Sequence, residues 1–298
     1  MAITRRFLLG AAGGALAVRT AGSAVAQVPV SPPRPVPATR RDVTREVIPS
    51  LSITPATAAR VGRQVWINES GGRDDGVTVW NAAEDFPSLG IGHFIWFKAG
   101  GHPMFEESFP KVVAYIRAKG VRPPAWLDRQ TVPPCPWTSK AHFEREFRSP
   151  RMNELRAYLL ATVPQQTEYL LERTEAAIPK MLATLPDARD RAHLLSQLTR
   201  LVQSSPDLYP LIDYVNFKGE GISPKETTFD PVTGRNQGWG FKYLLLEMRG
   251  TSTGAPALAE FSRAAKFVLD RRIRNNPPSA RWRAGWHKRC DTYARPLI

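Results

Sequence analysis

Helical periodicity runs through this chain from residue 54 to its C-terminal end, and one β-prone stretch, residues 74–97, interrupts it. Thr54 and Pro55 have the pattern of an N-cap followed by proline at the first helical position, and Gly71 and Gly72 break the helix that follows. Residues 74–97 carry β-prone residues on both sides of a turn-rich centre, which predicts a small hairpin. We therefore expect a mainly α (α+β) fold with a small β-hairpin beside a helical body.

Proline- and glycine-rich breaks divide the rest of the chain into helical segments. Residues 168–185 and 187–203 are both amphipathic and adjacent in the chain, which favours an antiparallel helix pair. Residues 207–217 predict a buried helix, and residues 218–237 predict a polar loop. Further helices are expected over 105–119, 139–148, 150–162, 239–248 and 257–275, before a terminal helix with Trp282 and Trp286.

The N-terminal segment has the composition of an export signal. Residues 1–26 combine Arg5 and Arg6 with a short apolar run and a small-residue exit. The arginine pair resembles a twin-arginine signal, although a general secretory signal or an uncleaved anchor would also explain an apolar N-terminus. Residues 27–49 are rich in proline and arginine, which favours an extended linker. We expect a signal over 1–26, a linker over 27–49 and a single domain over 50–298 in a periplasmic or secreted protein.

The chain is strongly basic, with a formal net charge of +14. In a cytosolic protein this charge would indicate nucleic-acid binding. An exported protein instead meets anionic wall polymers and lipid head groups. The expected partners are therefore peptidoglycan or a related anionic or amino-sugar polymer, with peripheral association at the envelope and no nucleic acid.

Several common reaction centres have no pattern in this sequence. The histidines form no HExxH motif, and Cys135 and Cys290 lie too far apart in the chain to resemble a cysteine zinc site. The two cysteines are compatible with one disulfide or with two buried thiols. Neither a G-x-S-x-G elbow nor a glycine-rich phosphate loop after a strand is present. We therefore expect a reaction that needs neither a metal nor a cofactor.

Glu69 is the leading candidate for acid chemistry. Cleavage of a glycosidic bond needs a carboxylic acid near the leaving oxygen, and an apolar wall favours the protonated form by raising its pKa. Glu69 follows the apolar residues 65–67 at the end of the first predicted helix, which would supply such a wall. A glutamate that ends a helix in solvent is the alternative.

Glu69, the stretch that follows it and the sequence SLGIGH at residues 88–93 resemble the active-site region of phage-type lysozymes, in the lysozyme-like superfamily. The resemblance implies a helical domain with a small β-hairpin over a cleft. It also implies that Glu69 is the general acid, that Ser88 holds a water on the opposite face of the sugar, and that His93 is a structural or cleft-wall residue.

This chain departs from that family at the second carboxylate. The position of the family's aspartate is Ala82 here, and the nearest substitutes are Glu84 and Asp85. A mechanism that uses Glu69 alone, as in lytic transglycosylases and goose-type lysozymes, is therefore also compatible with the sequence.

Other residues could contact a polymer. Glu220 lies between two glycines, so its backbone could approach a ligand, although a solvated loop residue would have the same pattern. Asp213 precedes it on the predicted buried helix, where a structural ion pair is expected. Indole rings stack on sugar rings but also fill cores, so each tryptophan has two interpretations. The tryptophans considered are Trp80, Trp96, Trp239, Trp282 and Trp286.

These features predict an exported enzyme that cleaves β-1,4-linked amino-sugar polymers of the cell wall. Two alternatives stay open. A catalytically inactive protein of the same fold would bind or organise peptidoglycan, and a chitosanase-like hydrolase would act on a de-N-acetylated chain.

Overall fold

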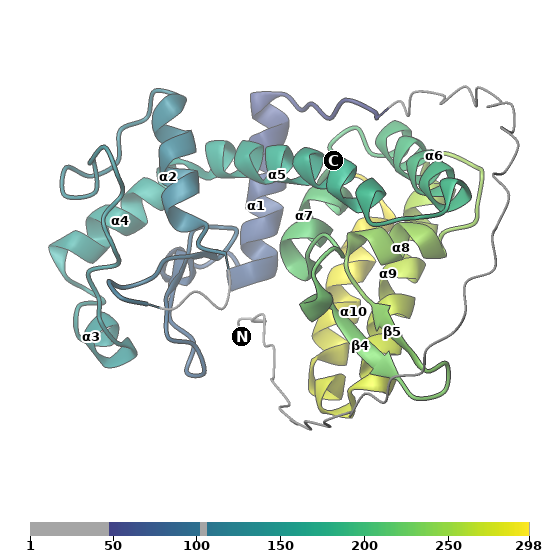
Figure 1. The fold of residues 1–298 in the computed structure, drawn as a ribbon. Helices are drawn as coiled ribbons and strands as arrows, with labels where there is room; N and C mark the ends of the chain where they lie inside the picture. The colour runs from purple at the N-terminus through teal and green to yellow at the C-terminus, as the bar shows by residue number, and fades with distance from the viewer. Residues whose placement is uncertain (1–47, 102–105, 298) are drawn as a thin grey trace, which may run out of the picture. The chain divides into compact units, whose positions relative to one another are not determined.

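The computed structural model of this chain describes residues 48–101 and 106–297, which form a mainly helical fold with two small antiparallel sheets (Figure 1). The predicted signal and nearly all of the predicted linker lie outside the described residues. Short 3-10 turns connect several helices. The α-helices are α1 Pro55–Ser70, α2 Phe109–Ala118, α3 Lys140–Arg145, α4 Pro150–Ala161, α5 Val163–Ala183, α6 Ala188–Ser204, α7 Tyr209–Lys218, α8 Phe241–Glu247, α9 Ala255–Asn275 and α10 Arg283–Asp291.

Helix α1 begins and ends as its sequence predicts. The side chain of Thr54 accepts a hydrogen bond from the Thr57 backbone N–H at 3.2 Å and so caps the first turn. Gly71 has φ +69°, a left-handed conformation that suits glycine and ends the helix. The last turn of α1 therefore carries Glu69 at a fixed position.

Helices α5 and α6 do not form the predicted antiparallel pair. Helix α5 packs against α1, α2 and α7, whereas α6 packs against α8 and α9 (Figure 1). Both apolar stripes are buried, as their periodicity predicts, but each is covered by other helices. Two adjacent amphipathic helices each have an apolar face that must be covered. Their sequences do not say which other helices cover it.

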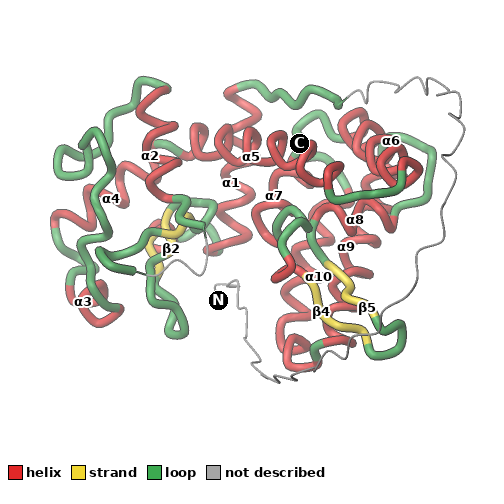
Figure 2. The backbone as a smooth tube through the Cα atoms, viewed as in Figure 1, coloured by secondary structure: helices red, strands yellow, loops and turns green. Residues whose placement is uncertain are grey.

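The β-prone stretch forms a three-stranded antiparallel sheet and not a single hairpin. The strands are β1 Thr78–Val79, β2 Ser88–Leu89 and β3 Phe94–Ile95, and β2 pairs with both neighbours. Each strand has two residues, which is too short for a clear alternation of apolar and polar positions. Figure 2 shows β2 among the loops that make up most of this region.

The predicted polar loop over 218–237 contains a second hairpin. Strands β4 Thr227–Asp230 and β5 Arg235–Gly238 pair in an antiparallel ladder next to α9. Most of their side chains are polar and at least partly exposed, so the apolar alternation that reveals a strand in sequence is missing. The prediction of a loop was wrong for this reason.

Several helix boundaries also differ from the sequence pattern. Helix α2 begins at Phe109 rather than at residue 105, and α5 begins five residues earlier than expected. The terminal helix starts at Arg283, so Trp282 precedes it. Proline is tolerated in the first turn of α2 and of α5, where no intrahelical N–H bond is lost.

The described residues belong to one compact unit with a continuous apolar core. Cys135 and Cys290 are two separate buried thiols, and burial raises the pKa of each to about 12. Within residues 48–101 and 106–297, no helix has both the length and the apolar character needed to cross a bilayer.

Candidate active site

Glu69 is buried, with only 6% of its surface exposed. It lies in the last turn of α1, next to the core residue Val65. The alternative of a glutamate that ends a helix in solvent is therefore wrong. A buried carboxylate needs partners, because an unpaired charge in a poorly solvated site costs several kcal/mol or more.

Three segments far apart in sequence supply those partners. Oε1 of Glu69 accepts hydrogen bonds from Asn216 Nδ2 on α7 at 3.2 Å and from Arg289 Nη2 on α10 at 2.8 Å. His93 Nδ1 lies 3.5 Å from Oε2 of Glu69. The last turn of the first helix, the turn after β2 and the terminal helix therefore meet at this carboxylate.

The glycines of the SLGIGH sequence shape the turn that brings His93 to Glu69. Gly90 has φ +69°, and a Cβ there would lie 2.3 Å from the side-chain oxygen of Gln166. That oxygen accepts a hydrogen bond from the Ile91 backbone N–H at 2.9 Å, so α5 anchors the turn. His93 itself has φ +49°, a conformation uncommon for a residue with a side chain. The turn is therefore held from outside, and His93 is positioned with it.

Arg289 connects Glu69 to a second buried carboxylate. Its Nε and Nη2 bind both oxygens of Asp213, at 2.8 and 2.7 Å, and Tyr293 donates its hydroxyl to the same carboxylate at 2.5 Å. Burial opposes the charge of Arg289, but Asp213 and Glu69 outweigh it and hold the pKa of Arg289 well above its ordinary value. The structural ion pair predicted for Asp213 is thus confirmed.

Two further buried cations lie in the same region. Lys218, at the end of α7, places Nζ 3.6 Å from the centre of the Trp286 ring. The guanidinium of Arg272 on α9 lies 3.8 Å from the ring of Trp239 and 5.2 Å from that of Trp286. Burial, and then Arg272 and Arg289, hold the pKa of Lys218 well below its ordinary value. Burial also lowers the pKa of Arg272 to about 10.

The other predicted catalytic residues lie in the small sheet and the loop before it. Ser88 is buried in the central strand β2, where its backbone pairs with β1 and β3. Glu84 accepts a hydrogen bond from Asn81 Nδ2 at 2.7 Å within its own loop. The Asp85 side chain is 76% exposed and pairs with Lys98. The two carboxylates of this loop have partners of their own, Asn81 and Lys98.

The predicted aromatic platforms are mostly buried. Trp80 is 6% exposed and donates its ring N–H to the Glu84 backbone, and Trp96 is fully covered by other aromatic rings. Trp239 and Trp286 are each 3% exposed, and cations cover their ring faces. The rings of Trp239 and Trp286 therefore contact cations in this structure.

Glu220 is not the solvated loop residue that its pattern suggested. It is 9% exposed, and its side chain lies 3.7 Å from Arg173. The glycines on either side have positive φ, and the backbone of this segment bonds directly to the start of α8. A Cβ at Gly240 would lie 2.3 Å from the Gly221 nitrogen, so close backbone contact explains these glycines.

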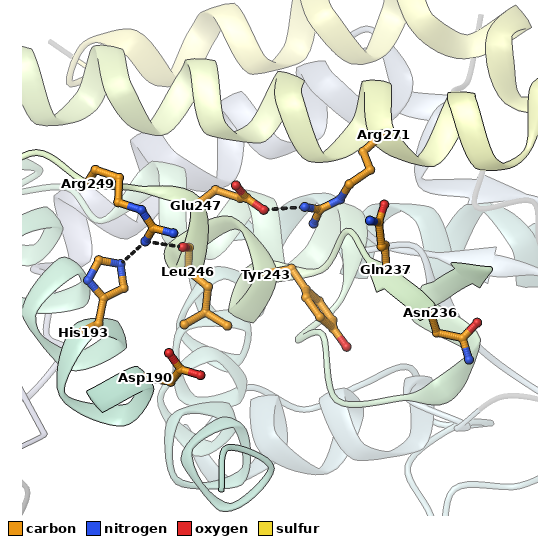
Figure 3. A pocket seen from close by; sticks show the side chains of 9 residues that line it. All are labelled: Asp190, His193, Asn236, Gln237, Tyr243, Leu246, Glu247, Arg249 and Arg271. Carbon is orange, nitrogen blue, oxygen red and sulfur yellow. Dashed lines mark hydrogen bonds and ion pairs between the residues drawn. The ribbon is translucent and has the colours of Figure 1, made fainter. Parts of the chain in front are cut away.

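A separate cavity of about 360 Å³ lies on another side of α9, between α6, α8 and β5 (Figure 3). Arg271 forms an ion pair with Glu247, and Arg249 donates to Nε2 of His193 at 2.9 Å. The ring of Tyr243 also lines the cavity. We place the candidate active site at Glu69 and not in this cavity, because the buried, concentrated charges that tune acid chemistry are at Glu69.

Sequence inspection missed the residues that complete the Glu69 site. Arg289, Asn216 and Lys218 come from helices more than a hundred residues further along the chain. The only signal in the sequence was that Asp213, Asn216 and Lys218 interrupt an otherwise apolar stretch. A charged or amide side chain on a helix that is buried on all faces needs a partner or a ligand.

Comparisons with known proteins gave no match among family models, curated proteins or solved structures. In the part of the chain that the structure describes, no group of three or more histidine, cysteine, aspartate or glutamate side chains is arranged to hold a metal ion.

Proposed function

We propose that this protein is an exported cell-wall enzyme that cleaves β-1,4-linked amino-sugar chains, with Glu69 as the proton donor. The observation that carries the proposal is the burial of Glu69 between the SLGIGH turn and the terminal helix. The sequence resemblance involves Glu69 and that turn, and the side chains of Glu69 and His93 meet. The basic charge and the export-type N-terminus suit a polymer outside the cytoplasm.

The proposed chemistry starts with proton transfer from Glu69 to the glycosidic oxygen. The leaving sugar then departs from a centre with oxocarbenium-ion character. Either water, held near Ser88, or a hydroxyl of the same sugar completes the reaction. The first route is hydrolysis and the second is lytic transglycosylation.

The partners and the burial of Glu69 bear on how it could transfer a proton to a polymer. Arg289 donates to the Glu69 carboxylate, and Asp213 binds the same guanidinium. Asn216 fixes the orientation of the carboxyl group. Because only a small edge of Glu69 is exposed, a polymer has to displace neighbouring side chains to reach it.

A second candidate function is peptidoglycan binding without cleavage. The ion pair between Glu69 and Arg289 favours it, since such a pair can be purely structural.

The test is release of soluble glycan from purified peptidoglycan and from chitosan by the wild type and by Glu69→Gln. The proposal predicts release from peptidoglycan by the wild type and its loss in a folded Glu69→Gln variant. Glu84→Gln is the matched variant that asks whether a second carboxylate takes part. The chemical nature of the released ends separates hydrolysis from transglycosylation.

Three results would contradict a part of this proposal: the substrate, the cleavage or the role of Glu69. Activity on chitosan alone would favour a chitosanase-like enzyme. Inert wild-type protein that still sediments with peptidoglycan would favour the binding function. Full activity in Glu69→Gln would remove Glu69 from the mechanism.

A further inference from the structure

Lys218 lies beside the Glu69 site in an environment that does not satisfy its charge. It is 9% exposed, and its Nζ rests on the rings of Phe217 at 3.8 Å and Trp286 at 3.6 Å. Among the described residues, no carboxylate pairs with it and no acceptor receives a hydrogen bond from it. Ring faces attract an ammonium group, but they accept no strong hydrogen bond from its three N–H groups.

The charges that act on Lys218 are mainly of its own sign. Two guanidinium groups, those of Arg272 and Arg289, oppose its charge, and one carboxylate, that of Glu69, favours it. Asp213 is held by Arg289 in a two-point ion pair. Nη1 of Arg289 is also buried and has no hydrogen-bond partner in the structure. Lys218 and Nη1 of Arg289 therefore carry buried positive charge, and their N–H groups have no acceptor among the described residues.

The positive charge of Lys218 is still less compensated in the state that the proposed reaction needs. A proton donor must be protonated, and protonation of Glu69 removes the carboxylate that favours Lys218. The sugar then develops positive charge of its own. An anion bound next to Lys218 would offset these charges.

We propose that Lys218 binds a carboxylate carried by the substrate, so that the polymer is an acidic glycan with a free carboxylate beside the cleaved bond. This inference rests on the proposed function for the role of Glu69. Its central claim, that the Lys218 site binds an anionic sugar substituent, is tested by binding alone.

The experiment uses the full chain with Glu69→Gln, so that bound glycan is not cleaved. The probes are amino-sugar oligomers from peptide-free wall glycan, with the carboxylate either free or converted to the neutral amide. Calorimetry should show roughly 10- to 100-fold tighter binding of the free carboxylate, which is the range for a charge-assisted hydrogen bond. Oligomers with a phosphate ester in place of the carboxylate test whether any oxyanion is accepted.

Lys218→Met in the same background should abolish the preference for the free carboxylate. Lys242→Met is the matched control, since Lys242 is also buried near an aromatic ring but donates to Thr184 Oγ1 at 2.9 Å. The control should keep the preference. If Lys218→Met does not fold, Lys218→Gln, which keeps a polar group but no charge, should weaken the preference in the same direction.

Equal affinity for the free and amidated oligomers, or an unchanged preference in a folded Lys218→Met protein, would overturn the inference. A stronger preference for the phosphate ester would overturn the choice of carboxylate. If the wild type cleaves nothing and yet binds the acidic oligomer through Lys218, the proposed cleavage fails and the anion site stands. If the wild type cleaves neutral chains as fast as acidic ones, the proposed cleavage stands and the anion site fails.

Discussion

Arg271 and Arg272 are neighbours on α9, but their side chains lie in two different regions of the molecule. Arg272 lies on Trp239 in the buried Glu69 site, whereas Arg271 pairs with Glu247 in the cavity of Figure 3. The cavity's arginines contact acceptors, Glu247 for Arg271 and His193 for Arg249. The charged residues of the Glu69 site are each at most 9% exposed, and Lys218 among them rests on ring faces. Buried charge is therefore a better guide to chemistry here than the size of a hollow.

The largest expected difference between the two regions is in the free energy of unfolding after loss of an arginine. Arg289→Met leaves Glu69 and Asp213 buried without their shared cation, and removal of one partner from such a site costs about 3–5 kcal/mol. Arg271→Met removes a partly exposed pair in the cavity and should cost about 1 kcal/mol. Urea unfolding of both variants measures the difference. Equal losses would show that the two regions do not differ in this way.

A smaller difference in stability is expected between alanine substitutions at Gly90, in the turn near Glu69, and at Gly234, in the β4–β5 hairpin. Gly90→Ala would place a Cβ against Gln166 in a left-handed turn and should cost about 2–4 kcal/mol. Gly234, in the β4–β5 hairpin, also has positive φ but nothing within 4 Å of an added Cβ. Gly234→Ala should therefore cost only the backbone term, about 1–2 kcal/mol. Thermal unfolding of both variants tests whether Gln166 anchors the SLGIGH turn.

A pH effect should also distinguish the Glu69 site. The pKa of Lys218 is held below its ordinary value of 10.5 in the folded protein, first by burial. At a pH between its folded and unfolded values, the unfolded chain binds one more proton, so stability rises with pH. The wild type should therefore gain stability relative to Lys218→Met as the pH rises above the folded pKa of Lys218 towards 10.5, with a limit of about 1.4 kcal/mol per pH unit.

Urea unfolding at several pH values below about 9 checks this expectation. Above that range the thiols of the unfolded chain lose their protons, whereas burial keeps the pKa of Cys290 at about 12 in the fold. That contribution is lost as the pH rises and would oppose the effect of Lys218. Parallel curves for the wild type and Lys218→Met would contradict the assignment.

The smallest effect is expected in the cavity. Asn236 is an exposed residue of β5 that lines it. Asn236→Ala should change the unfolding free energy by less than about 0.5 kcal/mol and leave glycan release unchanged. A large loss of release with stability intact would move the functional site from Glu69 to the cavity.

The sequence predicted the local parts of this molecule better than their assembly. The Thr54 cap, the Gly71 stop and the buried stripes of α5 and α6 follow from short-range rules and are confirmed. The partners of those stripes, and the polar β4–β5 hairpin, depend on contacts that periodicity does not encode. Glu69 could be selected from its position next to an apolar run and from the turn that follows.

The rest of the site could not be selected in this way. Arg289 on α10 reaches Glu69 on α1 and Asp213 on α7 only in the folded chain, and Gln166 supports the turn from α5. One sign was present in the sequence. Asp213, Asn216 and Lys218 interrupt a segment that is otherwise apolar on every face, and each of them lies in the site.

The most direct test of the account is the rate of soluble glycan release from peptidoglycan by Glu69→Gln and Glu247→Gln. Each variant removes one carboxylate charge that faces an arginine, one in the buried site and one in the cavity. Glu69→Gln should lower the rate by about 10²- to 10⁴-fold, as expected for loss of a general acid, while Glu247→Gln should keep the wild-type rate. Equal rates in the two folded variants, or a loss confined to Glu247→Gln, would contradict it.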